Sequence, residues 1–177
     1  NMKIGLCGTM SVGKTTLVRA LEYEVEFIDY KFTTERSKYL RDLGIPLNTD
    51  STVKGQSIFL AERASELLNE NIITDRTIID VMAFAKCANS ISEDDAKKFC
   101  DFASTMLEDY DHIFYVSTEG TVIEDNGVRT IDEEYREKID NTIRELLFEY
   151  RDQIRDFTTI SGTTEQRLKQ INEVLFP

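Results

Sequence analysis

Residues 8–15 read G-T-M-S-V-G-K-T, which matches the phosphate-binding pattern G-x-x-x-x-G-K-[ST] without a mismatch. Glycines in such a loop let backbone N–H groups bend around phosphate oxygens. Lys14 would add a positive charge toward the β- and γ-phosphates, and the Thr15 hydroxyl would bind Mg²⁺. The pattern therefore predicts that the chain binds a nucleoside triphosphate. The residues predicted to contact it are Gly8, Thr9, Ser11, Val12, Gly13, Lys14, Thr15 and Thr16.

The elements around this loop alternate between apolar runs and helical patterns. Strands are predicted at about 2–7, 24–29, 71–75, 112–117 and 157–160. Helices are predicted at about 14–24, through 38–40, at 52–69, 78–88, 93–109 and 131–151, and after Thr163. This order predicts an α/β fold of the three-layer P-loop NTPase type, with a five-stranded parallel sheet and helices on both faces. Residues 1–177 form a single domain in this interpretation.

Ligands of such a sheet bind at the carboxyl ends of its strands, where Asp75 and Arg76 follow the third strand. The Asp75 carboxylate could hold Mg²⁺ or its waters, or accept a hydroxyl proton, and Arg76 could bind a phosphate or substrate oxygen. A structural Asp–Arg pair, or a helix N-cap, is the alternative. Asp80, one turn further on, is expected to be a helix-surface or supporting residue.

Glu35 and Arg36 follow the second predicted strand and its loop. In a phosphotransfer enzyme this position suits a catalytic base and an arginine that anchors the acceptor. A solvated end of a loop would have the same composition. Asp29, at the end of the predicted strand itself, is a competing candidate for the base.

Gln56 and Arg63 lie seven residues apart on the predicted helix 52–69 and therefore face nearly the same way. Beside a buried stripe, this pair could bind the edge of a base or ring. The alternative is a surface helix on which Arg63 pairs with Glu62 or Glu66. The stripe is predicted to comprise Leu60, Ala61, Ala64, Leu67 and Leu68.

The polar, glycine-bearing segment after the fourth strand suits a lid, at about 118–136. Arg129 within it could stabilise charge on a transferring phosphoryl group, and Arg136 could join it. Closure of a lid excludes water that would waste the nucleotide. Ordinary loop charges are the alternative.

Composition narrows the classes of partner. The net charge of −12, from 21 basic and 33 acidic residues, disfavours nucleic acid without excluding a local basic patch. No apolar stretch approaches the roughly 20 residues of a membrane span. The three cysteines lack metal-ligand spacing and are predicted to be reduced core residues of a cytoplasmic protein, with Cys7 buried in the first strand. His112 is predicted to be a hydrogen-bonded structural residue, and a homodimer is compatible with the sequence.

The chain resembles the P-loop nucleoside and nucleotide kinases over most of its length. The stretch from F-L-A-E-R (59–63) through I-I-T-D-R (72–76) to A-F-A (83–85) is similar to thymidylate kinases. That likeness implies that Arg63 reads the base, Asp75 works near Mg²⁺ and Arg76 holds the acceptor.

Other segments resemble the ribosylnicotinamide-kinase domain of NadR-like proteins. They are Glu35-Arg36, D-N-G-V-R (125–129), Tyr135-Arg136 and S-G-T (161–163) with the later Arg167-Leu168. The likeness implies that the loop after the last strand passes the adenine ring, which places Gly162 and Thr163 near ATP. The phosphate loop lacks the acidic residue common in thymidylate kinases, and the lid holds one clear arginine, so the acceptor stays open.

These patterns favour a kinase that moves the γ-phosphoryl group of ATP, with Mg²⁺, to a nucleoside or nucleoside monophosphate. The rival class is an NTPase switch or motor that acts on a protein partner. No [NT]-K-x-D guanine-reading pattern occurs, and the fourth strand ends in Ser117-Thr118 without an acidic pair to activate water. A third hypothesis, a kinase of a modified base in DNA, is opposed chiefly by the acidic surface.

Overall fold

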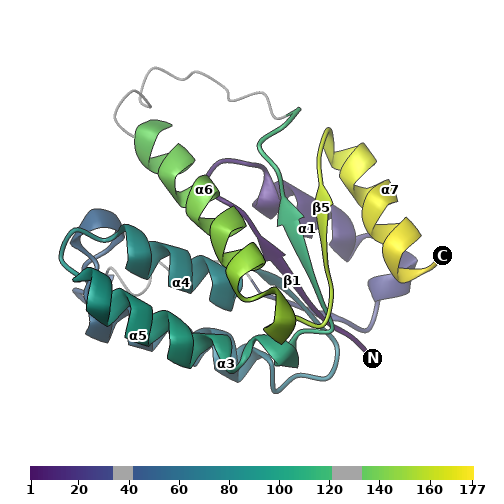
Figure 1. Cartoon of the computed structure of the whole chain (residues 1–177). Helices are drawn as coiled ribbons and strands as arrows, with labels where there is room; N and C mark the ends of the chain where they lie inside the picture. Colours follow the sequence, from purple (N-terminus) through teal and green to yellow (C-terminus); the bar gives the residue numbers. More distant parts are fainter. Residues whose placement is uncertain (34–41, 121–132) are drawn as a thin grey trace.

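The computed structural model describes residues 1–33, 42–120 and 133–177. Within this part of the chain five strands form one all-parallel sheet in the order β2-β3-β1-β4-β5 (Figure 1). The strands are β1 (Lys3–Cys7), β2 (Lys31–Thr33), β3 (Ile72–Asp75), β4 (His112–Val116) and β5 (Phe157–Ile160). The helices are α1 (Lys14–Glu22), α3 (Val53–Glu66), α4 (Ile78–Cys87), α5 (Glu93–Ser104), α6 (Glu133–Glu149) and α7 (Thr164–Leu175).

Helices cover both faces of the sheet and enclose two apolar clusters. On one face, α1 and α7 pack their apolar side chains against β1 and β4, as Leu17, Ile171 and Phe114 illustrate. On the other face lie α3, α4, α5 and α6 (Figure 1). The predicted three-layer fold is therefore confirmed. Because β1 is the central strand, the loop that follows it emerges between β3 and β4.

The second strand is not where the sequence placed it. Residues Val25–Phe27 form a single 3₁₀ turn, and β2 begins only at Lys31. Of this apolar run only Phe27 is buried, against Tyr30 and Phe176, whereas Val25 and Ile28 stay exposed. Strand pairing instead joins Lys31 to Ile72 on β3.

This shift overturns the assignment of Asp29 as a candidate base. Asp29 precedes β2 and therefore lies at the amino end of the strands, away from the phosphate loop. It is an exposed residue.

The buried face of α3 also differs from the predicted stripe. Its buried residues are Gly55, Gln56, Leu60 and Arg63, while Ala61 and Leu68 are exposed. The sequence placed the Gln56–Arg63 pair beside this stripe or on a surface helix, and both residues are buried. Gln56 and Arg63 instead share the inner face with Leu60.

Two boundaries differ as well. The helix predicted at 93–109 ends at Ser104, and Leu107–Asp109 forms a separate 3₁₀ turn. Two further 3₁₀ turns span Asn48–Asp50 and Arg151–Gln153. The helix predicted through 38–40 lies outside the described residues.

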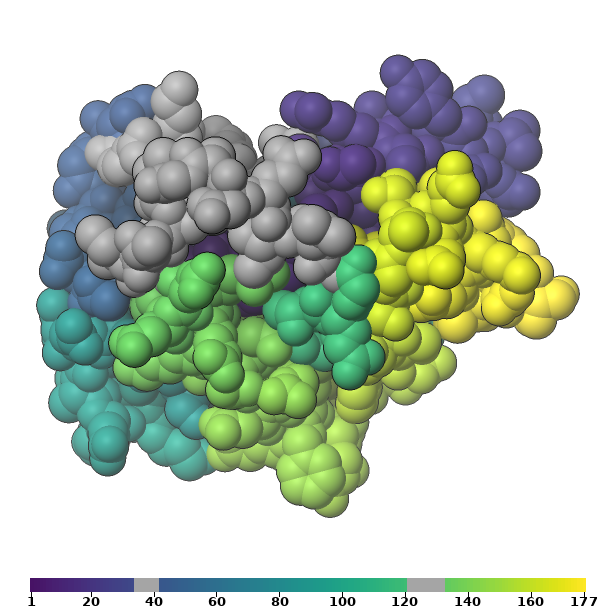
Figure 2. Space-filling model, turned by 90° about the horizontal axis from the view of Figure 1, so that it is seen from above, coloured from purple at the N-terminus to yellow at the C-terminus, as the bar shows by residue number. Residues whose placement is uncertain are grey.

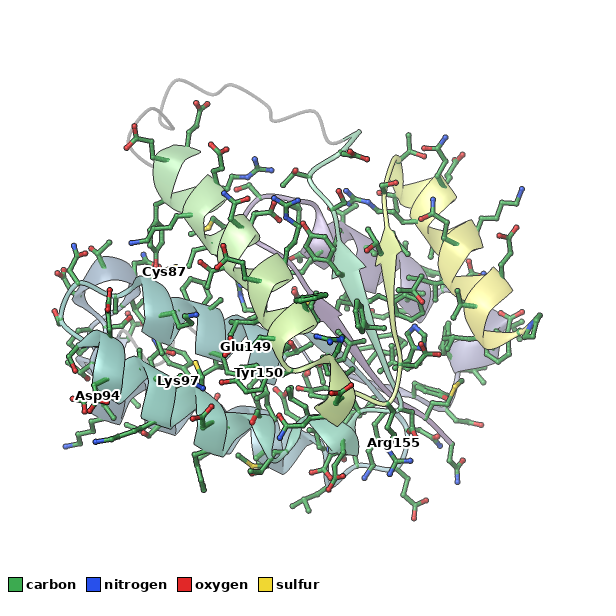
Figure 3. All side chains as sticks on the ribbon, in the orientation of Figure 1. Cys87, Asp94, Lys97, Glu149, Tyr150 and Arg155 are labelled. Carbon is green, nitrogen blue, oxygen red and sulfur yellow. The ribbon has the colours of Figure 1, made fainter. Side chains whose placement is uncertain are left out.

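Polar contacts fasten the end of α6 to α5. Lys97 bonds to Asp101 at 2.7 Å and lies 3.7 Å from Glu149, and the Tyr150 hydroxyl donates to Asp101 at 2.7 Å. Figure 3 shows Lys97, Glu149 and Tyr150 together where α5 meets the end of α6. Exposed ion pairs contribute little singly, but this group fixes the helix whose other end carries Arg136.

Several smaller expectations are confirmed. The three cysteines are free and buried, with Cys7 in β1. His112 is buried and forms a 2.8 Å hydrogen bond with the Thr158 hydroxyl. No helix in the described part of the chain is long and apolar enough to cross a membrane.

Gly5 is a position in β1 where crowding, rather than backbone strain, excludes a side chain. A Cβ there would lie 2.5 Å from Thr77 Cγ2 and 2.9 Å from Tyr110 Cε1. We expect Gly5→Ala to lower the free energy of unfolding by about 1–3 kcal/mol in a denaturant titration. The displaced Tyr110 would also disturb α4, because its hydroxyl accepts the Ile78 N–H at 3.1 Å.

Gly44→Ala is the matched control, since Gly44 has a φ of +87° and a Cβ at that position would have no heavy atom within 4 Å. It isolates the cost of left-handed backbone, about 1 kcal/mol. A Gly5→Ala protein as stable as the native chain would contradict the close packing of β1 against α4.

Candidate active site

The loop between β1 and α1 has the conformation of a phosphate cradle. Ser11 and Gly13 have left-handed backbone, with φ of +61° and +89°, and Gly13 caps α1. Gly8 has no room for a side chain, because a Cβ would lie 3.0 Å from the Val116 carbonyl oxygen of β4. The loop therefore joins the sheet edge to the N-terminus of a helix, a position that favours anions.

Three cations donate hydrogen bonds to backbone carbonyl groups of this loop. Lys14 Nζ donates to the carbonyl oxygens of Gly8 at 2.6 Å and Thr9 at 2.8 Å. Arg136 Nε donates to Met10 O at 2.8 Å, and its Nη2 lies 3.5 Å from Ser11 O. Arg167 Nη1 donates to Val12 O at 2.5 Å.

Five consecutive carbonyl groups, those of residues 8–12, thus point toward cations. In a peptide unit the C=O and the following N–H point in opposite directions. The N–H groups of residues 9–13, which follow these carbonyls, therefore point away from the carbonyls and can bind phosphate oxygens.

Asp75 lies beside this cradle at the carboxyl end of β3. It is paired with Leu6 in the sheet register, and its Oδ2 accepts a hydrogen bond from Thr15 Oγ1 at 3.1 Å. Burial raises the pKa of its carboxyl, and the nearby charges of Lys14 and Arg76 and the Thr15 hydrogen bond oppose this effect. Asp75 and Thr15 are thus next to each other at the edge where the phosphates would bind.

This pair fits a magnesium ion that is shared with a nucleotide. Hydroxyl and carboxylate oxygens suit Mg²⁺, which usually takes one or two protein ligands and completes its shell with phosphates and water. Among the described residues no group of three or more acidic, histidine or cysteine side chains could hold a metal by itself.

Arg76 reaches back to the loop from the position after β3. Its backbone is left-handed, with φ of +91°, and its N–H donates to Leu6 O at 2.9 Å. Nη1 of the guanidinium lies 3.5 Å from Gly8 O and 3.4 Å from Asp80 Oδ1. The same guanidinium lies 5.0 Å from the centre of the Phe84 ring.

The loop after β5 meets the segment after β4. The Gly162 N–H donates to Glu119 O at 3.2 Å, and a Cβ on Gly120 would lie 2.9 Å from Gly162 Cα. From above, the residues that follow β4 and those that follow β5 are neighbours on this face (Figure 2). Thr163 caps α7 through a reciprocal box with Gln166. Gly162 and Thr163 thus lie on the α7 side of the site, where the adenine contact was predicted.

A family model described as an AAA domain matches residues 3–167 of the chain. The chain belongs to this AAA-domain family.

Solved structures of P-loop kinases share the fold of this AAA-domain chain. The NadR protein in complex with NR has a TM-score of 0.71 and 17% identity, and the match covers 96% of this chain and 50% of NadR. The chain therefore spans about half the length of NadR. Deoxyadenosine kinase from M. mycoides, solved with dCMP and dCDP, has a TM-score of 0.66 and 22% identity, with 98% of both chains covered.

The same deoxyadenosine kinase with bound dATP gives a TM-score of 0.61 at 21% identity, covering 98% of this chain and 99% of the other. No match was found among curated protein sequences. The expected likeness to P-loop nucleoside kinases, including NadR, is confirmed. At these identities the likeness establishes the fold of the AAA-domain chain.

Arg63 and Gln56 have different surroundings although they share one face of α3. Arg63 Nη1 donates to Asp75 O at 3.1 Å, and Nη2 lies 2.8 Å from Glu66 Oε1. The ion pair with Glu66 was foreseen only for a surface helix, yet here it is buried. Gln56 is 3% exposed; its backbone N–H donates to Thr52 O at 2.9 Å, and no hydrogen bond of its side-chain amide is found among the described residues.

Two buried residues support the site from outside the predicted set. Asp80 is 0% exposed and accepts the Gly8 N–H at 3.1 Å, so of its two expected roles it has that of a supporting residue and not that of a helix-surface residue. The T-x-x-D spacing of Thr77 and Asp80 is a capping-box signal that could have placed it. Arg167 also links α7 to Ser117 O, at 3.2 Å, and its position four residues before Ile171 marks the inner face of that helix.

The predicted site residues Glu35, Arg36 and Arg129 lie outside the described residues, so their roles stay predictions. The loop residues, Asp75, Arg76, Arg63 and Arg136 meet at the carboxyl edge of the sheet, whereas Asp29 lies at the opposite end. Arg136 contacts the phosphate loop, as its predicted part in the site requires, but does so through the carbonyls of Met10 and Ser11.

The raised pKa of Asp75 predicts how the stability of the nucleotide-free protein depends on pH. A carboxyl whose pKa is higher in the folded than in the unfolded chain stabilises the fold at acid pH and loses this contribution as pH rises through the folded pKa. We expect Asp75→Asn to raise the melting temperature of the nucleotide-free protein at pH 8, and the gain to shrink as pH is lowered.

The variant should at the same time lose magnesium-dependent affinity for ATP, as measured by calorimetry. Asp29→Asn, which changes an exposed carboxyl, is the matched control and should leave the melting temperature unchanged. A lower melting temperature for Asp75→Asn at pH 8 would show that the carboxylate is a net stabilising group.

Proposed function

We propose that the chain is an ATP-dependent kinase that transfers the γ-phosphoryl group to a hydroxyl of a nucleoside. The observation that carries the proposal is the contact of Thr15 with the buried Asp75 beside Lys14, at the mouth of the phosphate loop. A triphosphate-binding loop, a metal-binding pair and a carboxylate that can accept a proton then occupy one edge of the sheet. The nucleoside-kinase folds of deoxyadenosine kinase and NadR support the same proposal.

The residues of the loop would bind and orient the donor. Its N–H groups would contact the phosphates, and Lys14 would exchange its bonds to Gly8 O and Thr9 O for bonds to phosphate oxygens. Gly162 and Thr163 would lie against the adenine ring. When bound, Mg²⁺ supplies positive charge at the phosphates, and Thr15 and Asp75 are the side chains that would hold it.

Transfer itself needs positioning and charge stabilisation. The acceptor oxygen forms a bond to the γ-phosphorus while the bond to the β,γ-bridging oxygen breaks and ADP leaves. The hydroxyl proton passes to a carboxylate, for which Asp75 and Glu35 are the candidates. Arg129 would stabilise charge on the transferring group, and Arg36 would anchor the acceptor.

The engagement of two arginines favours an uncharged acceptor over a nucleoside monophosphate. Arg63 is paired with Glu66 and the Asp75 carbonyl, and Arg76 lies between Asp80, Gly8 and Phe84. Binding a second phosphate through either would require breaking these contacts. The Gln56 amide, which has no hydrogen-bond partner among the described residues, suits the edge of a base or ring.

The decisive experiment incubates the pure chain with ATP, Mg²⁺ and a panel of nucleosides, nucleoside monophosphates and nicotinamide riboside, read by mass spectrometry. We expect ADP formation that depends on one nucleoside and a product heavier by one phosphate. Lys14→Ala should lower the rate by about 100-fold or more, since it removes charge from the transferring group.

Phosphorylation of a monophosphate instead would correct the acceptor class. Hydrolysis that needs no acceptor and is stimulated only by a protein would favour the switch, the second candidate, which the AAA-domain match makes worth testing. The end of β4 argues against a switch, because Ser117 and Thr118 offer no carboxylate to activate water. The net charge of −12 disfavours a kinase of a modified base in DNA.

Gln56→Leu tests the acceptor side separately. The substitution keeps the size of the side chain and removes its hydrogen-bonding groups, so we expect KM for the nucleoside to rise roughly tenfold with less change in kcat. Ser57→Ala, on the exposed side of the same helix, is the control. An unchanged KM for Gln56→Leu would remove Gln56 from the acceptor site.

A further inference from the structure

Asp80 is a buried carboxylate whose two oxygens serve different parts of the molecule. Oδ2 accepts the Thr77 N–H at 2.6 Å and the Thr77 hydroxyl at 2.9 Å, which completes the cap of α4. Oδ1 accepts the Gly8 N–H at 3.1 Å and lies 3.4 Å from Arg76 Nη1. One side chain thus joins the start of α4, the first glycine of the phosphate loop and the arginine after β3.

Capping alone does not account for a buried charge at this position. The cap of α7 in the same chain is also a reciprocal capping box but uses the neutral Gln166, whose Oε1 accepts the Thr163 N–H at 2.9 Å. A fully buried carboxylate is expensive unless cations and donors compensate it. Thr77 compensates Oδ2 of Asp80, and the compensation for Oδ1 comes from Arg76 and the Gly8 N–H, both at the site.

Arg76 depends on α4 for its orientation. Its left-handed backbone, φ +91°, turns the side chain back across the end of the sheet. Asp80 and Phe84, one turn apart on α4, then hold the guanidinium by charge at 3.4 Å and by ring contact at 5.0 Å. From this place Nη1 also reaches to within 3.5 Å of Gly8 O.

We propose that Asp80 is a positioning residue, which holds the Arg76 guanidinium and the first residue of the phosphate loop, Gly8, in the arrangement that binds the triphosphate. The proposal rests on the proposed phosphotransfer function of this edge of the sheet. In this role Asp80 does not contact the substrate. Asp80 acts through Arg76 and the phosphate loop.

The test is a double-mutant cycle between Asp80→Asn and Arg76→Ala. The asparagine side chain has the size of the aspartate side chain but lacks its charge and one of its two acceptor oxygens. It can therefore accept from only one of the Gly8 and Thr77 N–H groups, which both donate to Asp80. We expect Asp80→Asn to lower kcat by roughly 10- to 100-fold in the native background, as misplacement of site groups does. In the Arg76→Ala background the same change should lower kcat by less than about threefold, because residues that act as a unit are not additive.

Thr77→Ala separates the contribution of Asp80 to the cap of α4 from its contacts with Gly8 and Arg76. It removes the hydroxyl that donates to Oδ2 and leaves both Oδ1 contacts, so it should lower the melting temperature by a few degrees with kcat within about twofold of native. Equal losses of kcat in Thr77→Ala and Asp80→Asn would overturn the proposal, as would additive effects in the cycle.

The same four proteins of the cycle are also compared by their affinity for a non-hydrolysable ATP analogue with Mg²⁺, measured by calorimetry. This measurement needs no acceptor. If the native chain phosphorylates nothing in the acceptor panel, the proposed function fails while this readout still decides on Asp80. Coupled losses of affinity would support the positioning role, and additive losses would end it.

Discussion

The site depends on the contact between three cations and the outward-facing carbonyls of residues 8–12. Lys14 comes from α1, Arg136 from α6 and Arg167 from α7, so the conformation of the loop is determined by helices on both faces of the sheet. The carbonyl groups of the loop accept hydrogen bonds from all three cations. Positive side chains therefore gather at the loop, where a polyphosphate would bind, in a chain whose net charge is −12.

The two buried carboxylates near the loop, Asp75 and Asp80, have different surroundings. Asp75 is buried at the end of β3 beside Thr15, and its raised pKa reflects burial that the neighbouring charges only partly offset. Asp80 is buried one turn into α4 and is compensated by Arg76 and two backbone N–H groups. The first arrangement suits a group that takes part in binding or proton transfer, and the second suits a group that holds its neighbours in place.

The AAA-domain match and the kinase-like fold are compatible, because both rest on a strand, a phosphate loop and a helix. A fold of this kind hosts several activities, and the activity has to be argued from the site. Arg63 and Arg76 are held by other groups of the protein, and Gln56 is buried with a side chain that can form hydrogen bonds. These features bear on the choice of acceptor rather than on the binding of the donor.

Local pattern was sufficient for much of the fold. The phosphate loop, the ends of β3 and β5 and the caps at Ser92 and Thr163 depend on residues close in sequence, and the structure has them where the pattern predicts. The alternation of strands and helices was likewise enough to predict a parallel sheet, which brings Asp75 and Arg76 to the edge that holds the loop.

Contacts between distant segments decided the rest. The run at residues 24–29 has the composition of a strand, but pairing with β3 selected Lys31–Thr33 instead. The sequence left open whether Gln56, Arg63 and Asp80 lie on the surface or at the site, because burial of polar residues is favourable only once their partners are near. The sequence by itself determined where a phosphate could bind, since that needs one short loop. Which charges surround it was decided by tertiary structure, because their partners lie up to 155 residues away along the chain.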